Sequence, residues 1–200
     1  MEFTPKLFAK VSKILDSYNG FIKKGMVLES MGITDCQVIF ARKNIGIVSS
    51  GKLDLYNNSA NDTGFASYIV FREGGKNINV LNVHGKSRPG HKKDTLARLN
   101  QSKRIIDFFE NMIGPKIVGG DFNLNPDTKS IAMFEKAGYK NLIKDFEIKN
   151  TRNKISWKQF DNVQHFADYV FVSPDVKVKK FEVPYNEISD HLPQILEFEI

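Results

Sequence analysis

Short apolar segments of strand length recur along most of this chain, and glycine-containing turns separate them. Residues 65–72 and 78–83, for example, are rich in β-branched and aromatic residues and flank a turn at 73–76. This pattern is typical of paired strands. Between such segments, apolar residues recur every three or four positions, most clearly over residues 94–113, as in an amphipathic helix. Strands predominate in this pattern, and helices are interspersed among them. This arrangement predicts packed sheets flanked by helices.

Three helices are expected between the strands. Thr4-Pro5 suits the N-cap and first turn of a helix whose apolar stripe runs through residues 7–15, and Gly20 is expected to end it. A second helix begins at Asp94-Thr95, and a third spans residues 129–137. The buried face of the second helix is predicted to comprise Leu96, Leu99, Ile106, Phe109 and Ile113. Further strands are predicted at residues 26–28, 37–41, 45–48, 53–56, 116–119, 166–173, 176–183 and 194–200. With no repeat or flexible linker, residues 1–200 are expected to form a single domain.

Composition excludes several classes of protein. Nothing approaches the roughly 18 consecutive apolar residues that a membrane-spanning helix needs, and the first ten residues are too polar for a signal peptide. The single cysteine, Cys36, excludes an internal disulfide and is typical of a reducing compartment, so a cytoplasmic protein is expected. A net charge of +6 suits an anionic partner such as nucleic acid, although many basic proteins carry such a charge only for solubility.

Polar residues end the predicted strand at 78–83, in the place where sites gather in layered α/β proteins. Asn82 and His84 are two positions apart and therefore lie on the same face of the strand. Gly85 allows a sharp turn beside whatever His84 contacts. A histidine that is simply hydrogen-bonded at a strand end is the simpler explanation of this segment alone.

A second polar segment follows the predicted strand at 116–119. Two glycines precede Asp121 and Asn123 and leave room for a ligand to approach the backbone. The Asp121 carboxylate can accept a proton or bind a metal, and the Asn123 amide can donate hydrogen bonds to a phosphoryl oxygen. A polar turn continuing into Asn125-Pro126 is the alternative, and the paired glycines favour a functional site.

The third segment, Ser189-Asp190-His191, places an acid beside a base just before the last predicted strand. Asp190 can bind a hard cation while His191 acts on a substrate. Upstream, Asp168 lies inside an apolar strand, where an unpaired carboxylate is costly. Asp168 is therefore interpreted as the group that orients His191 and stabilises its protonated form, with a surface carboxylate as the alternative.

Taken in order, these segments resemble the motif series of the endonuclease/exonuclease/phosphatase superfamily, which includes DNase I and exonuclease III. The matching motifs are Asn-Val-His-Gly at 82–85, Gly-Asp-Phe-Asn at 120–123, Asp-Tyr-Val at 168–170 and Ser-Asp-His at 189–191. The helix at 94–105 also looks like one common in bacterial members. The resemblance extends from about Phe65 to Ile200, and before Phe65 only the order of a helix and strands matches. It implies an α+β fold, a four-layer αββα sandwich, here lacking the first one or two strands.

The resemblance also implies roles for these residues. Asp121 would activate or hold the attacking water, and Asn123 would steady the phosphate. His84 and His191 would stabilise charge on phosphoryl oxygens, and Asp168 would pair with His191. Asp190 would contribute to a metal site, because carboxylates and water suit Mg²⁺ or Mn²⁺ better than zinc.

The N-terminus departs from the superfamily pattern. Members normally begin with a strand ending in a metal-site Asn, followed by a strand ending in Gln-Glu, whose Glu is the main metal ligand. Two alignments are open: either Glu2 occupies that ligand position, directly before the Leu7 helix, or the chain begins beyond it. Absent strands would leave sheet edges and apolar helix faces uncovered.

Two basic segments are candidates for substrate contacts. Lys86 and Arg88, with His91, Lys92 and Lys93, follow His84 and either touch phosphates near the scissile one or form a solvated loop. Residues 151–160 interleave Arg152 and other basic residues with Trp157 and Phe160, as in segments that stack on bases. Core packing of Trp157 is the alternative.

These features predict a metal-dependent hydrolase of phosphodiester bonds, with nucleic acid as the first substrate class. A phosphodiesterase for small molecules or lipid headgroups on the same fold is one alternative, because fold and core motifs do not fix the substrate. An inactive, nucleic-acid-binding remnant is another, because the pattern lacks the superfamily's first N-terminal strands.

Overall fold

The computed structural model describes residues 2–3, 5–28, 33–55, 64–158 and 163–200 of the chain. Its helices are α1 (Pro5–Ile14), α2 (Leu96–Glu110), α3 (Lys129–Lys136) and α4 (Leu142–Asp145), with a 3-10 helix η2 (Lys154–Ser156). Its strands are β1 (Glu2–Phe3), β2 (Tyr18–Leu28), β3 (Ile33–Arg42), β4 (Gly46–Asp54), β5 (Phe65–Glu73), β6 (Lys76–His84), β7 (Lys116–Asp121), β8 (Lys140–Asn141), β9 (Asp168–Val172), β10 (Lys177–Glu182) and β11 (Ile195–Glu199). No described helix is long and apolar enough to cross a membrane.

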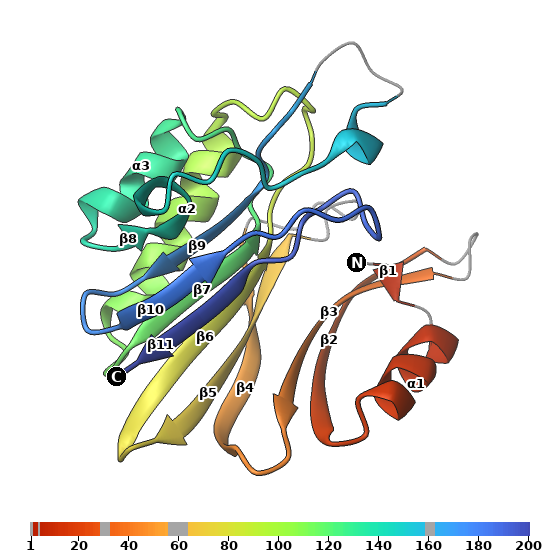
Figure 1. Ribbon diagram of the computed structural model, residues 1–200, viewed down its shortest axis with the longest axis vertical. Helices are drawn as coiled ribbons and strands as arrows, with labels where there is room; N and C mark the ends of the chain where they lie inside the picture. The colour runs from red at the N-terminus through yellow and green to blue at the C-terminus, as the bar shows by residue number, and fades with distance from the viewer. Residues whose placement is uncertain (1, 4, 29–32, 56–63, 159–162) are drawn as a thin grey trace.

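A mixed six-stranded sheet forms the centre of the molecule, in the order β4-β5-β6-β7-β9-β8. Its strands pair antiparallel except for β6 and β7, which are parallel and are joined through α2. Figure 1 shows α2 and α3 together on one face of this sheet. Apolar side chains from both helices and from the strands form one continuous core cluster between them.

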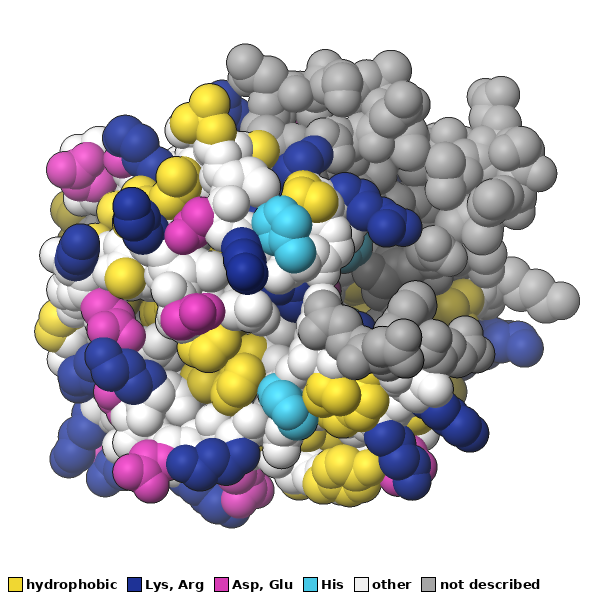
Figure 2. All heavy atoms as spheres, turned by 90° about the horizontal axis from the view of Figure 1, so that it is seen from above, with side chains coloured by type: hydrophobic (Ala, Val, Ile, Leu, Met, Phe, Trp, Pro, Cys, Tyr) yellow, Lys and Arg dark blue, Asp and Glu magenta, His cyan; other side chains and the backbone are white. Residues whose placement is uncertain are grey.

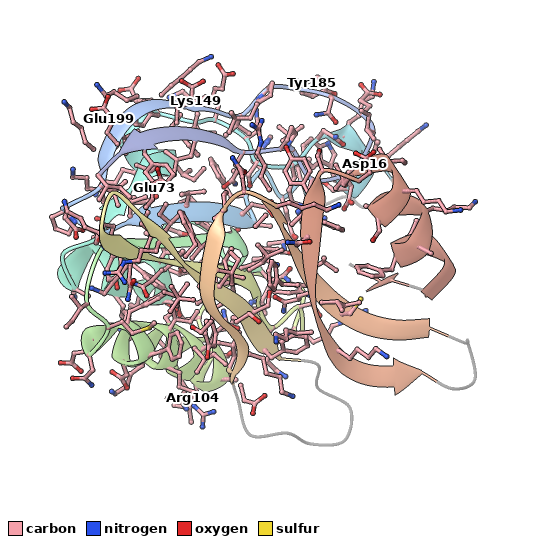
Figure 3. The ribbon with its side chains drawn as sticks, turned by 90° about the horizontal axis from the view of Figure 1, so that it is seen from below. Asp16, Glu73, Arg104, Lys149, Tyr185 and Glu199 are labelled. Carbon is pink, nitrogen blue, oxygen red and sulfur yellow. The ribbon has the colours of Figure 1, made fainter. Side chains whose placement is uncertain are left out.

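The other face of the sheet is covered by strands in two separate parts. One part is the antiparallel pair β10-β11, and the other is the sheet β1-β3-β2, with α1 on its outer side (Figure 1). Helices, sheet, second strand layer and helix together make the predicted four-layer α+β fold. No ladder joins β10-β11 to β1-β3-β2 among the strands that the structure describes. Seen from below, Glu73 and Glu199 lie on one side of the molecule and Asp16, just after α1, lies on the other (Figure 3).

The N-terminal helix is shorter than the sequence predicts. Its expected cap, Thr4, lies outside the described residues, and the helix ends at Ile14 instead of continuing to Gly20. Gly20 instead lies in β2, paired with Phe40 of β3. A Cβ on Gly20 would be 2.9 Å from the Phe40 ring and 3.2 Å from the Phe8 ring, so this glycine gives space to two aromatic rings that lie 6.2 Å apart. It serves packing between α1 and the sheet rather than helix termination.

The start of α2 agrees closely with its sequence signal. Thr95 is the N-cap, and its hydroxyl accepts a hydrogen bond from the Arg98 amide, so the helix begins at Leu96. The predicted buried face is only partly right. Phe109 is buried, whereas Leu96 is 75% and Ile113 is 90% exposed. Three polar side chains of this helix, Arg98, Gln101 and Ser102, are instead fully buried.

Candidate active site

Three site residues occupy the ends of three adjacent strands. His84 of β6 is in register with Asp121 of β7, and Asp121 is in register with Asp168 of β9. Residues in register on paired strands project to the same face of a sheet, so the three side chains gather at one edge of it. Phe122, directly after Asp121, is fully buried and packs edge-on against three other aromatic rings, which anchors this edge in the core.

His191 is held between carboxylates. Its Nδ1 is 2.9 Å from both carboxylate oxygens of Asp168. Its Nε2 is 3.9 Å from Asp121 Oδ2 and 3.7 Å from Asp190 Oδ2. Asp168 is itself fixed, because it is buried and its backbone amide donates to the hydroxyl of Thr151. The contact with Asp168 makes Nδ1 the donor of a neutral imidazole, and Nε2 then faces Asp121.

These surroundings change the pKa values of both partners. Burial acts to lower the pKa of His191, but the hydrogen bond to Asp168 and the three nearby carboxylates outweigh it and raise that pKa above its usual value. Burial also raises the pKa of Asp168 to about 6, against the opposing effect of His191. The His191–Asp168 pair therefore retains protons at higher pH than either group would in water.

Asp121 is positioned by Asn123. The Asn123 amide N–H donates to Asp121 Oδ1 at 2.7 Å, and Asn123 Nδ2 donates to Asp121 Oδ2 at 3.1 Å and to the Gly85 carbonyl at 3.2 Å. Asn123 adopts a φ of 54°, in the left-handed region that asparagine tolerates better than most residues. Its Oδ1 accepts a hydrogen bond of 2.6 Å from the ammonium group of Lys92, which is buried.

Arg152 and Asp190 form an ion pair at the rim of the site. Arg152 Nη2 lies 3.1 Å from Asp190 Oδ2, and the backbones of Arg152 and His191 form a β-bridge. Arg152 Nη1 also donates to Gln164. The pair joins the loop before β9 to the loop that carries His191, and so places Asp190 near His191.

Comparison with known proteins identifies the family. The model of the endonuclease/exonuclease/phosphatase family matches residues 37–191, which include the segment from β3 to His191. The chain belongs to this family. No curated protein matches the sequence.

Solved structures of this family have the same fold. An endonuclease/exonuclease/phosphatase from Bacteroides vulgatus superposes with a TM-score of 0.79 at 21% identity, covering 100% of this chain and 82% of the other. A mannosyl-6-phosphatase of Bacteroides thetaiotaomicron gives 0.75 at 19% identity, with coverage of 100% and 83%. The D. rerio TDP2 complex with a single-stranded DNA product gives 0.72 at 15% identity, with coverage of 100% and 84%.

The site of this family member contains a group of side chains that could hold a metal ion. One ligand atom from each of Asp121, Asp168 and His191 lies within 4.8 Å of the others. Two carboxylates suit a hard divalent cation whose remaining ligands are waters. Asp190 lies outside this group and is paired with Arg152. Glu2 forms part of β1, and its side chain lies outside the described part of the chain.

The structure brings together most, but not all, of the predicted site residues. His84, Asp121, Asn123, Asp168, Asp190, His191 and Arg152 share one edge of the sheet. Trp157 packs against the His165 ring at 5.3 Å, just after η2. Lys86 and Arg88 lie in the loop that follows His84, where Arg88 is exposed.

Sequence reasoning missed the residues that hold this loop. The buried Arg98 donates to the carbonyl oxygens of Lys86, Ser87, Pro89 and Lys93, and Gln101 Oε1 accepts from the Lys86 amide. The sequence signal that could have revealed these residues is a polar face on an otherwise amphipathic helix. It is weak, because charged residues on a helix usually face solvent. Lys92 was considered only as one member of a basic loop.

Proposed function

We propose that this protein hydrolyses phosphate esters by metal-assisted attack of water, with phosphodiesters of nucleic acid as its substrates. The observation that supports this most strongly is His191, oriented by Asp168 and directed towards Asp121. Phosphoryl transfer depends on positioning and charge neutralisation, which such a cluster can supply.

In this mechanism each residue has a defined task. Asp121 accepts the proton of the attacking water, and Asn123 holds its carboxylate in place. Protonated His191 donates through Nε2 to a phosphoryl oxygen, and Asp168 stabilises its positive charge. His84 faces the same phosphate. A divalent cation held by the carboxylates, with Asp190 and Glu2 as further candidates, would neutralise charge that develops on the phosphoryl group.

Two observations support nucleic acid as the substrate. The face of the molecule that carries the site presents lysine and arginine side chains around exposed histidines (Figure 2). Its exposed basic residues include Arg88, Lys93, Lys154 and Lys158. Such charges contact phosphates on either side of a scissile bond. The similar TDP2 structure contains a single-stranded DNA product.

A small phosphorylated molecule is the second candidate. A pocket of about 520 Å³ opens next to the site, between the loop after Asn123 and the loop before β9, and His91, Asn125 and His165 contribute to its lining. Its size suits a sugar or a nucleoside. One similar structure is a mannosyl-6-phosphatase.

The test compares three substrates: supercoiled plasmid, bis-p-nitrophenyl phosphate and p-nitrophenyl phosphate, each with Mg²⁺ or Mn²⁺ and then with EDTA. We expect metal-dependent nicking of the plasmid. Asp121→Asn should reduce it by about 10²–10⁴-fold, because the proton acceptor is lost. The control Asp107→Asn removes an exposed carboxylate on α2 that pairs with Lys103, and should leave the rate unchanged. Turnover of the monoester alone would favour the second candidate. A folded wild-type chain that is inert on all three substrates would contradict the proposal.

A further inference from the structure

Two buried cations lie beside the site, and they differ in how far their donors are used. Arg98 is completely buried, and each of its three nitrogens donates to carbonyl oxygens of the 86–93 loop. Lys92 is 4% exposed, and its ammonium donates to Asn123 Oδ1. An ammonium group has three donors. In the part of the chain that the structure describes, Lys92 has no other hydrogen-bond partner and no carboxylate within ion-pair distance.

The backbone holds Lys92 in this position at a cost. Lys92 has a φ of 53°, a left-handed conformation that is unfavourable for a residue with a Cβ. Its carbonyl accepts from the Asn125 amide, which ties it to the loop after β7. Arg98 binds the carbonyl oxygens of Pro89 and Lys93 on either side of it. The loop is therefore built to direct this side chain inward, although lysine normally places its charge in water.

The hydrogen bonds of Asn123 show which group is free to act on a substrate. Its amide orientation is fixed, because Nδ2 faces two acceptors and Oδ1 faces a donor. Both Nδ2 hydrogens are used, one on Gly85 and one on Asp121. Asn123 thus has no side-chain donor left for a phosphoryl oxygen, whereas Lys92, directly beside it, has two.

The electrostatic surroundings agree with this geometry. Burial lowers the pKa of Lys92, and the negative charges of Asp121 and Asp168 oppose that effect. Lys92 therefore lies close enough to the carboxylates of the site to interact with them electrostatically, although it pairs with neither. A dianionic or monoanionic phosphate would complete its coordination and relieve the desolvation of its charge.

We propose that the Lys92 ammonium group binds a non-bridging phosphoryl oxygen of the substrate, while Asn123 serves to hold Asp121. This inference rests on the proposed function, since it assigns the phosphate contact of that same site. The Lys92 ammonium group differs from the exposed basic groups of its loop, because it is buried and fixed before any ligand binds. It also differs from a structural lysine, whose donors would be satisfied within the protein.

The experiment measures binding of inorganic phosphate by calorimetry, in the presence of Mg²⁺, so that turnover is not required. The variants are Lys92→Met, which keeps the length of the side chain, and Lys76→Met, which removes an exposed lysine at the opposite end of β6. We expect the dissociation constant to rise at least tenfold in Lys92→Met and to change less than twofold in Lys76→Met. The melting temperature of Lys92→Met should be equal to or above that of the wild type, because an incompletely paired buried charge is removed.

Three results would overturn the proposal. They are a wild-type chain that binds no phosphate, equal affinity in Lys92→Met and wild type, or a loss of affinity that Lys76→Met shares. A lower melting temperature with unchanged phosphate affinity would show that Lys92 is structural. If the wild type turns over a phosphodiester, Lys92→Met should lower kcat by about 10²-fold, the usual effect of removing one such donor. Weakened phosphate binding without any wild-type turnover would reject the proposed hydrolysis and leave the assignment of Lys92 intact.

Discussion

The six-stranded sheet and the N-terminal sheet β1-β3-β2 are stabilised in different ways. The first shares a continuous apolar cluster with α2 and α3, and no described residue before Leu53 belongs to that cluster. The described contacts between the second and the main sheet include several hydrogen bonds. Gln37 of β3 bonds to the Phe65 carbonyl, to Ser67 and to Asn82. Lys23 of β2 bonds to Ser50 of β4.

This difference explains where the site is found. Apart from Glu2 of β1, the residues assigned to it belong to the main sheet, to the loops between its strands, or to the loop between β10 and β11 that carries Asp190 and His191. These residues need positions fixed to within fractions of an ångström, and a close-packed core provides that. In the N-terminal sheet, Cys36, Gln37 and Ala41 are the buried residues whose side chains the structure describes. Its contribution to the fold is therefore expected to depend on a few buried hydrogen bonds.

The largest expected effect compares one phenylalanine from each region. Phe122 is fully buried among Phe134, Tyr169 and Phe171, so Phe122→Ala should lower the free energy of unfolding by about 3–5 kcal/mol. Phe8 of α1 is only partly buried against Phe40, so Phe8→Ala should cost about 1 kcal/mol. Urea unfolding measures both. Equal costs would show that the N-terminal region has a core as consequential as that of the main sheet.

A smaller effect should follow from removing the polar contact between the two layers. Gln37→Leu leaves the Phe65 carbonyl without its side-chain donor and Ser67 without its acceptor, and should cost about 1–3 kcal/mol. Lys23→Met removes the bond to Ser50 at the partly exposed side of the same sheet and should cost less than about 0.5 kcal/mol. The comparison is again made by urea unfolding. A stabilised Gln37→Leu variant would mean that apolar contact, not hydrogen bonding, holds the layers together.

Several of the predicted site residues lie close together in the structure because they are at strand ends. His84, Asp121 and Asp168 each mark the last or first residue of a strand, and strand pairing alone brings them side by side. The pairing of His191 with Asp168 was predicted from the cost of a carboxylate in an apolar segment, and the structure places the two groups 2.9 Å apart. The order of strands and helices predicted packed sheets flanked by helices, and the four-layer α+β fold was implied by the resemblance to the family.

The remaining features depend on contacts that no local pattern encodes. Gly20 has the appearance of a helix terminator, yet it lies in a strand because Phe8 and Phe40 need its space. Arg98 is buried because four carbonyl oxygens of the loop before α2 accept its hydrogen bonds. Lys92 is one of several basic residues in its loop, and only the fold of that loop separates it from its neighbours.

The smallest effect concerns the titration of His191, and it tests whether the site is independent of the N-terminal sheet. The pKa of His191 is raised in the folded protein, so its protonation stabilises the fold fully below its ordinary pKa near 6.5, and this stabilisation is lost as the pH rises through the raised value. The raised pKa of Asp168, about 6, acts in the same direction from pH 4 upward. The metal-free wild type should therefore lose stability as the pH rises from about 4 to 6 through Asp168, and lose more as the pH passes through the raised pKa of His191.

Two variants separate the sources of this effect. Asp168→Asn removes the hydrogen bond and the negative charge that raise the pKa of His191, so that pKa should fall when it is followed through the imidazole proton signals by NMR with EDTA present. Gln37→Leu changes only the contact between the layers, so the His191 pKa should stay at its wild-type value. A shift in Gln37→Leu as large as in Asp168→Asn would show that the N-terminal sheet tunes the site through Asn82 and β6. The two regions would then be coupled electrostatically, although they are packed in different ways.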